Sequence, residues 1–291
     1  MYLGLDFGTT GARAIVLDEA DSLAHAGRTA YSNPAAQTPE DWREALHLLL
    51  RQLPAHISTK LQRIAIDATS STVLLCDAGL QPISPVLFYH DTRAQAQAAE
   101  LKLLAPDNQI VCNASSGLAK FLWLTRHANA GNAAYFMHQA DWLSALLTES
   151  GGISDYHNAL KSGYDAENLC WPAWLLRLPH SHLLPHVLAP GNLIAEISPA
   201  LAQHFNINPG CTIHAGTTDS IAAFIAADMH QPGAAVTSLG TTLVLSSSQQ
   251  HVWKPQNSVF IVIVSVIYGL RVALPTRVVR CYDSISRMID S

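Results

Sequence analysis

The sequence predicts an α/β fold with functional residues at the ends of strands. Apolar runs of strand length alternate with amphipathic segments of helical length along most of the 291 residues. Small groups of Asp, Thr and Gly directly follow several of the apolar runs. Because no long linker separates these segments, we expect an alternating architecture, in which sites form where strands end.

Composition limits the classes of function. A hydrophobic content of 49% and a charged content of 13% are typical of a globular protein with a large core. The formal net charge of −5 provides no basic surface for nucleic acid. The five cysteines form no CxxC pair, which favours reduced thiols over a disulfide framework or a zinc site. The chain begins with a strand pattern and not with an export signal, so we expect a cytoplasmic protein without membrane or nucleic-acid partners.

The first segment, residues 3–11, reads LGLDFGTTG. An apolar strand carries Asp6 into a turn that contains Gly8, Thr9 and Thr10, and a second extended run follows at residues 12–17. A carboxylate beside backbone N–H groups and small hydroxyls suits a metal-bound polyphosphate, and glycine allows the phosphate to approach closely. An ordinary hairpin with a polar turn explains the same residues equally well.

The next segments continue the alternation. We expect a third strand near residues 23–31, then a helix that begins after the capping residue Thr38 and the early Pro39. An apolar strand from residue 64 ends in a cluster of small hydroxyls that includes Ser70. Residues 73–77 predict another strand, with residues 81–87 as its partner.

The second half of the chain is predicted mostly from periodicity. Residues 94–150 are expected to be largely helical, most clearly at 117–126 and 141–147, and residues 151–175 to be loop. A strand at 209–216 ends in Thr217-Thr218-Asp219, and helical composition follows at 220–227. A short strand at 234–238 enters Gly240-Thr241-Thr242.

Three of these motifs, in their order and separation, resemble the FGGY carbohydrate kinases. They are the turn after Asp6, the Thr217-Thr218-Asp219 segment and the Gly240-Thr241-Thr242 turn; residues 89–93, Tyr-His-Asp-Thr-Arg, also resemble the family's aromatic–x–Asp–x–Arg segment. The resemblance covers residues 1 to about 250. It implies the ribonuclease H-like fold of sugar kinases, heat-shock protein 70 and actin, with a sugar-binding domain at 1–215 and the incomplete start of a nucleotide-binding domain at 216–250.

The resemblance also implies roles in phosphoryl transfer from ATP. Asp6 would lie near Mg²⁺, and Asp219 would be the general base for the attacking sugar hydroxyl. The residues that would face the ATP phosphates are Gly8, Thr9, Thr10, Gly240, Thr241 and Thr242. Read from its position alone, Asp219 also suits the N-cap of the helix that follows it.

Sugar recognition is expected from Ser70, His90 and Asp91. Ser70 is equally suited to forming hydrogen bonds with the backbone of a turn, and Asp91 is equally suited to an ion pair with Arg93. Residues 154–165, SDYHNALKSGYD, resemble the D-ribulose kinase group of cyanobacteria and plants, formerly called xylulose kinase-like. That likeness implies a ketopentose substrate, such as D-ribulose or D-xylulose.

The tail at residues 251–291 does not resemble the family. Its uncharged run, 257–270, is shorter than the ~20 apolar residues of a membrane-spanning helix. A buried strand pair and an aggregation-prone segment are two further interpretations. The genetic code also permits residues 268–282 to be read one nucleotide earlier as LWVAGGASNTGGAVL, which looks like the continuation of an FGGY kinase. We therefore hypothesise a frameshift near codon 250, which predicts an impaired kinase or a sugar-binding remnant without turnover.

Overall fold

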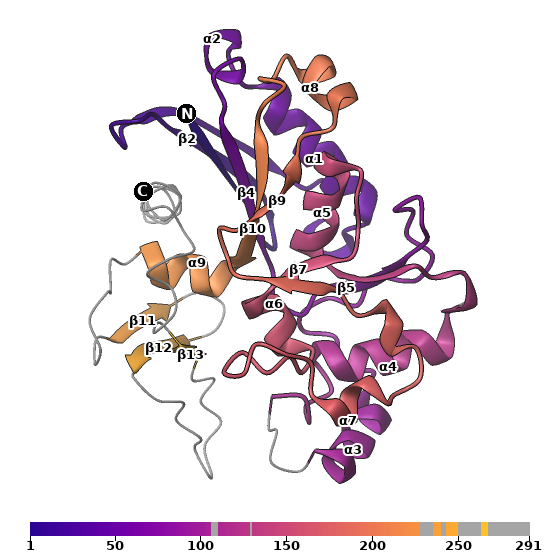
Figure 1. Ribbon diagram of the computed structural model, residues 1–291. Coiled ribbons are helices and arrows are strands. Elements are labelled where there is room, and N and C mark those ends of the chain that lie inside the picture. Colours follow the sequence, from indigo (N-terminus) through magenta and orange to yellow (C-terminus); the bar gives the residue numbers. More distant parts are fainter. Residues whose placement is uncertain (106–109, 129, 227–234, 240–242, 250–262, 267–291) are drawn as a thin grey trace.

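The computed structural model describes residues 1–105, 110–128, 130–226, 235–239, 243–249 and 263–266 (Figure 1). Its central element is a six-stranded sheet with the strand order β3-β2-β1-β4-β10-β9. These strands span β1 Tyr2–Phe7, β2 Gly11–Leu17, β3 Leu23–Ala30, β4 Arg63–Ala68, β9 Leu193–Glu196 and β10 Thr212–Thr218. Strands β1, β4 and β10 run parallel, whereas β2, β3 and β9 are antiparallel to their neighbours. The predicted α/β fold and the strands predicted near residues 3, 12, 23, 64 and 209 are confirmed.

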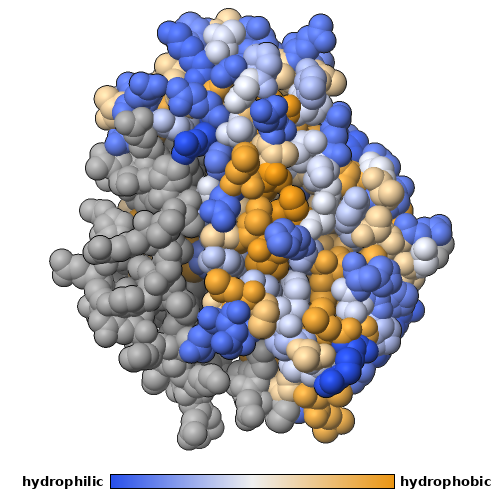
Figure 2. Space-filling view, in the orientation of Figure 1, coloured by the Kyte–Doolittle hydropathy of each residue, from blue (hydrophilic) through white to orange (hydrophobic). Residues whose placement is uncertain are grey.

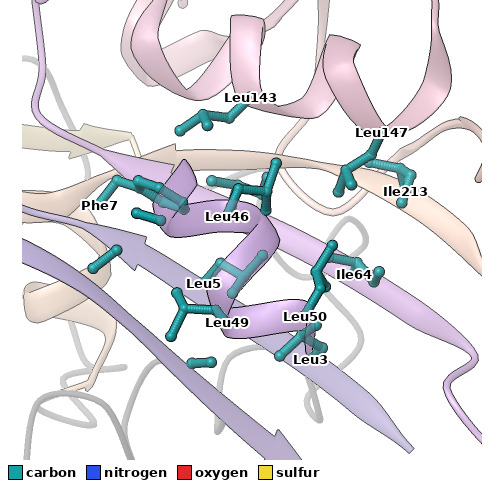
Figure 3. Close-up of a cluster of buried hydrophobic side chains, with 14 of the residues drawn as sticks. Leu3, Leu5, Phe7, Leu46, Leu49, Leu50, Ile64, Leu143, Leu147 and Ile213 are labelled. Atoms are coloured by element: carbon teal, nitrogen blue, oxygen red, sulfur yellow. The ribbon is translucent and has the colours of Figure 1, made fainter. Parts of the chain in front are cut away.

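Two helices cover one face of this sheet. Helix α1 (Pro39–Arg51) packs on β2 and β3, and α5 (Gln139–Thr148) packs on β4 and β10. Helix α1 begins with a capping box, in which Thr38 and Asp41 bond each other's backbone N–H groups. Figure 3 shows leucines of α1 and α5 beside those of the sheet. This burial of apolar surface makes the sheet and its helices one core.

Trp42 of α1 connects the core to the loops at the sheet's edge. Its side chain is fully buried and meets Trp142 and Phe88 edge to face, with ring centroids 6.1 and 6.2 Å apart. Its indole N–H donates a hydrogen bond to Gln37 Oε1 at 2.9 Å. Packing of α1 therefore also fixes Phe88, which precedes the predicted sugar-binding residues His90 and Asp91.

A second layer carries its own apolar cluster. It contains β5 Val73–Cys76, β6 Tyr135–His138, α3 Gln95–Leu104 and α4 Gly117–His127. Strands β5 and β6 pair antiparallel, and Phe121 of α4 packs on Phe136 of β6 at 5.0 Å between ring centroids. The helices predicted at 117–126 and 141–147 are confirmed by α4 and α5.

One local prediction is confirmed in part and another is wrong. Residues 81–87 lie beside β5 as predicted, but they form single bridges at Val73↔Leu87 and Cys76↔Pro82 and not a continuous strand. Pro82 and Pro85 lack backbone N–H donors and cannot continue a ladder, and β6 pairs with the other edge of β5. Residues 151–175 are not only loop, because they contain β7 Ile153–Asp155, α6 Tyr156–Lys161 and α7 Ala173–Leu176. These elements are too short to show a hydrophobic period.

The remaining elements complete the described chain. They are α2 Ala55–Ser58, α8 Pro199–Phe205, α9 Asp219–Ala226, β8 His186–Leu188, the 3-10 turns Pro34–Ala36, Ala130–Asn132 and Ser181–Leu183, and a separate sheet of β11 Ala235–Leu239, β12 Leu243–Gln249 and β13 Ile263–Val266. The strand predicted at 234–238 is confirmed by β11. Of the predicted tail, 251–291, only β13 is described, and the domain boundaries stay predictions.

The surface gives two further observations. Figure 2 shows apolar side chains gathered near the middle of one face, in the region where Figure 1 places α5 and β9. Leu193 of β9, an edge strand of the sheet, is 56% exposed.

Among the described residues, no helix combines the length and apolar character needed to cross a membrane.

Gly216 allows the close approach of β10 to β4. The register of these strands shifts between His214 and Thr217, and a Cβ atom at Gly216 would overlap the carbonyl oxygen of Ile66. Because a backbone atom cannot move aside as a side chain does, we expect Gly216→Ala to lower the free energy of unfolding by about 2 kcal/mol or more. Denaturant unfolding measures this loss.

The matched control for this substitution is Gly210→Ala. The nearest atom to a Cβ there is Asn208 Oδ1 at 3.7 Å, an ordinary contact. An equal loss of stability in the two variants would contradict the proposed role of Gly216.

Candidate active site

Three carboxyl groups meet where the parallel strands end. Asp6 lies opposite Asp67 in the register of β1 and β4, and Asp67 lies opposite Thr217 in the register of β4 and β10. Asp219 follows the last residue of β10 and is the first residue of α9. Because parallel strands have their carboxyl ends at the same edge of a sheet, the register of β1, β4 and β10 places all three acids together.

Asp6 is 7% exposed and pairs with a cation on the neighbouring strand. Arg13 Nη1 donates to Asp6 Oδ2 at 3.1 Å, in agreement with the register partners Asp6 and Arg13 of β1 and β2. Burial raises the pKa of Asp6, while the charge of Arg13 and the hydrogen bond from Asp67 oppose that rise. Burial prevails, so the pKa of Asp6, the predicted metal ligand, is raised in spite of the ion pair.

Asp67 is the acid that sequence reasoning missed. Its side chain is buried, and burial together with the charges of Asp6 and Asp219 raises its pKa well above the ordinary range. A hydrogen bond between the two carboxyl groups raises the pKa of Asp67 further and lowers that of Asp6. Asp67 Oδ2 has no partner among the described residues. The signal was available, because Asp67 follows an apolar strand as Asp6 does.

The turn between β1 and β2 lies beside Asp6. Gly8 N–H donates to the carbonyl oxygen of Gly11 at 3.1 Å, which closes the turn. The carbonyl oxygen of Thr9 accepts from Gln37 Nε2 at 2.6 Å, and that of Thr10 accepts from Tyr31 N–H at 3.0 Å. Both threonines remain exposed. The structure thus has the hairpin, and binding of phosphate by its exposed hydroxyls stays a prediction.

Asp219 is oriented by two backbone donors. Ser220 N–H donates to Asp219 Oδ1 at 2.7 Å, and Ser70 N–H also bonds this carboxylate. Burial raises the pKa of Asp219 to about 6; the two N–H groups and Lys161 lower it, and the charge of Asp6 raises it further. A carboxylate with this pKa can accept a proton near neutral pH. The residue is in the first turn of α9 and not the residue before it, as an N-cap would be.

Helix α6 holds the end of β10 in place. His157 Nδ1 lies 2.7 Å from Thr217 Oγ1, and Asn158 Nδ2 donates to the carbonyl oxygen of Thr217 at 3.3 Å. Asn158 also donates to Asp155 Oδ2 at 2.7 Å. Burial lowers the pKa of His157 to about 4, so this imidazole is neutral at pH 7. These residues were predicted as loop, and their contact with β10 could be seen only in the fold.

The predicted sugar-binding residues lie on two adjacent segments. Ser70 bonds Asp219 through its backbone N–H, and the next segment is joined to this turn by Tyr89 N–H, which donates to Thr72 Oγ1 at 3.1 Å. His90 is exposed and stacks on Phe88 at 6.1 Å between ring centroids. The structure therefore brings Ser70 and residues 88–91 to the same end of the sheet.

Asp91 forms the ion pair with Arg93 that the sequence allows. Arg93 Nε donates to both carboxylate oxygens at 2.9 and 3.0 Å, and Arg93 Nη2 lies 2.8 Å from Asp91 Oδ2. Burial opposes ionisation, but the hydrogen bonds and the charge of Arg93 prevail and hold the pKa of Asp91 below its usual range. The Asp91 side chain remains 14% exposed, so the pair leaves part of an ionised carboxylate accessible.

The chemistry of Asp6 and Asp67 fits Mg²⁺. This ion takes hard oxygen ligands and is commonly bound by one or two carboxylates together with water and phosphate. The unpartnered Oδ2 of Asp67 is a buried oxygen of that kind, next to Asp6. Groups of three or more His, Cys, Asp or Glu able to form a metal site do not occur within the described ranges. Gly240, Thr241 and Thr242 lie outside the described residues.

The raised pKa of Asp219 predicts a pH-dependent stability. The folded state binds the Asp219 proton more tightly than the unfolded state, so the associated stability is present at low pH and is lost as pH rises through about 6. We expect Asp219→Asn to stabilise the chain by on the order of 2 kcal/mol above about pH 7, and much less near pH 4. Thermal or denaturant unfolding across this range measures the difference; a constant difference would contradict the raised pKa.

Comparison with known proteins identifies the family of the chain. Residues 1–226 match the N-terminal domain of the FGGY family of carbohydrate kinases. A xylulose kinase of Klebsiella pneumoniae is 27% identical over 277 residues, which cover 89% of this chain and 57% of that protein. A ribulokinase of Shouchella clausii is 24% identical and is covered to 54%, against 86% of this chain.

Solved structures show the same fold. A xyloylose kinase from Brucella ovis is 26% identical with a TM-score of 0.73, over 84% of this chain and 54% of that one. A xylulose kinase from Rhodospirillum rubrum, 22% identical, has the same TM-score of 0.73 over the same shares and supports the fold alone. The predicted ribonuclease H-like fold is confirmed, and the chain spans about half the length of the relatives it matches. Since the family match covers most of its residues, the chain belongs to the FGGY family of carbohydrate kinases.

Proposed function

We propose that this site serves the ATP-dependent phosphorylation of a sugar hydroxyl, with a ketopentose as the substrate. The observation that carries the proposal is Asp219, a partly buried carboxylate at the end of β10 whose pKa of about 6 suits a general base. The charge of Asp6 influences the pKa of Asp219. Asp6 belongs to β1, which is separated from β10 by the single strand β4. A base and a metal-binding acid in one place are what phosphoryl transfer to an alcohol requires.

Each described residue has a defined task in this proposal. Asp219, held by the N–H groups of Ser70 and Ser220, accepts the proton of the attacking hydroxyl. Asp6 and Asp67 would hold Mg²⁺, which neutralises charge on the ATP phosphates when it is bound. Arg13 fixes Asp6 through its ion pair, and the exposed hydroxyls of Thr9 and Thr10 in the adjacent turn would face the phosphate oxygens.

The choice of a ketopentose rests on two kinds of support. Relatives of this chain bear the names xylulose kinase and ribulokinase. Ser70, His90 and Asp91 lie on adjacent segments and offer a hydroxyl, an imidazole and a carboxylate, which suit a polyhydroxy ligand. We keep D-ribulose and D-xylulose as the two candidates, and cytoplasmic location as a prediction from composition.

A sugar-binding remnant without turnover is the second candidate. The observation that favours it is the tail at 251–291, where the permitted alternative frame resembles the family and the actual frame does not. On this hypothesis the frameshift removed the nucleotide-binding half and impaired the kinase. Sequencing the gene tests it: downstream DNA without an open frame for the second domain would disprove the frameshift.

Two measurements on the same preparation separate the candidates. An active kinase releases ADP from MgATP only when D-ribulose or D-xylulose is present, and Asp219→Ala reduces this release by at least ~100-fold because the base is lost. Its rate should rise as pH increases through about 6, where Asp219 loses its proton. A remnant binds the sugar in a calorimeter without releasing ADP.

The matched control for Asp219→Ala is Glu44→Ala, which removes an exposed carboxylate from α1 and should change neither measurement. Hydrolysis of ATP that is independent of sugar would contradict both candidates and indicate an ATPase. A chain that neither binds a ketopentose nor transfers phosphate to one would overturn the proposed function.

A further inference from the structure

Lys120 is a buried ammonium that the proposed chemistry does not use. It lies in the middle of α4, and its side chain has no exposed surface. A lysine is rarely buried without a partner, because removing the charge from water is costly. Lys120 forms no carboxylate ion pair within the described residues. Its hydrogen bonds must therefore explain why it is there.

The ammonium binds three carbonyl oxygens on two different segments. Nζ donates to Ser71 O at 2.8 Å, to Phe88 O at 2.7 Å and to Tyr89 O at 3.3 Å. All three donors of the group are thus used. One segment is the turn that follows β4, and the other leads into His90 and Asp91.

These carbonyl groups flank the residues assigned to the sugar. Ser71 directly follows Ser70, whose N–H bonds the proposed base Asp219. Tyr89 directly precedes His90. A second link joins the same two segments, because Tyr89 N–H donates to Thr72 Oγ1 at 3.1 Å. The two segments are also joined at their base by the backbone bridge Val73↔Leu87. Beyond that bridge, at residues 70–72 and 88–91, Lys120 supplies three of the four described hydrogen bonds and so helps to set the spacing between the base side and the recognition side of the site.

We propose that Lys120 is a positioning residue that joins the turn at 70–72 to the segment at 88–91, so that both halves of the sugar site act as one preorganised surface. The proposal rests on the proposed function, because it assumes that these segments bind sugar. Lys120 does not touch the sugar itself. It acts by holding two backbone segments at a fixed separation, which lowers the ordering cost of binding.

The electrostatic surroundings give this residue a measurable signature. Burial lowers the pKa of Lys120 to about 7, and the negative charge of Asp91 opposes that shift. His138, on the neighbouring β6, is neutral because burial and the charge of Lys120 lower its pKa to about 3. The other titratable groups on the segment facing Lys120 are Tyr89, His90 and Arg93. Loss of the proton removes one hydrogen-bond donor from Lys120. Sugar binding at the site and protonation of Lys120 should therefore favour each other.

The first test compares binding of D-ribulose and D-xylulose by calorimetry in Lys120→Met and Lys120→Arg. Methionine keeps the apolar stem and removes all donors, so we expect affinity to fall by about tenfold or more. Arginine keeps charge and donors and should restore part of the affinity. Circular dichroism sets the temperature range in which each variant is folded, and affinities are compared only there.

A second pair of variants avoids the cost of removing a buried charge. Thr72→Val removes the hydroxyl that accepts from Tyr89 N–H and should also weaken sugar binding. Thr125→Val is its control: within the described part of the chain, this buried threonine of α4 bonds only backbone oxygens of its own helix, Phe121 O and Leu122 O. It should leave sugar affinity unchanged at a similar change in stability.

The decisive readout is the titration of Lys120 followed by NMR in chain labelled with ¹³C-lysine. We expect one ε-carbon resonance to titrate near pH 7, to be absent in Lys120→Met, and to shift to a higher pKa when the ketose saturates the site. A merely structural lysine would not respond to sugar. The proposal is overturned if sugar binds but leaves this titration unchanged, or if folded Lys120→Met binds sugar as the wild-type chain does.

Failure of the proposed function looks different. A wild-type chain that binds neither ketose overturns that function, and the role of Lys120 falls with it. Sugar binding that is intact in the wild-type chain and in both Lys120 variants overturns only the role of Lys120.

Discussion

The register of three parallel strands brings three carboxyl groups to one buried edge of the sheet. Neighbouring groups offset the electrostatic cost of placing these like charges together. Like charges at short range in a medium of low dielectric cannot all remain ionised. The pKa of Asp67 is raised well above its usual range, Asp6 pairs with Arg13, and Asp219 accepts two backbone N–H groups. Three acids of the same type thereby have three different electrostatic environments.

The surrounding structure keeps these acids in place from two sides. On one side, α6 bonds the end of β10 through His157 and Asn158, which fixes the start of α9 and hence Asp219. On the other side, the core residue Trp42 packs against Phe88, and Lys120 bonds the backbone at the same point. The site therefore stands on buried helices and strands, and its loops are attached to them by named polar contacts.

Much of this arrangement could be predicted from the sequence. Asp6 and Asp219 each follow an apolar strand, and the Thr38–Asp41 cap and the strands of the main sheet have clear local signals. The predictions that were incomplete or wrong involve short elements and pairing partners: residues 81–87 lie beside β5 only as single bridges, the strand β6 on the other edge of β5 was not predicted, and 151–175 contain β7, α6 and α7. Such elements have too few residues for a period, and a strand's partner is a long-range choice.

The sequence by itself determined the strands of the main sheet, the acids Asp6 and Asp219 and the family to which they belong, because these depend on local pattern and on residue type. Only the tertiary structure decided that Asp67 lies beside Asp6, that Lys120 joins two segments, and that His157 bonds Thr217. These properties depend on burial and on contacts between residues far apart in the chain. No local pattern encodes a desolvation cost or a partner dozens of residues away.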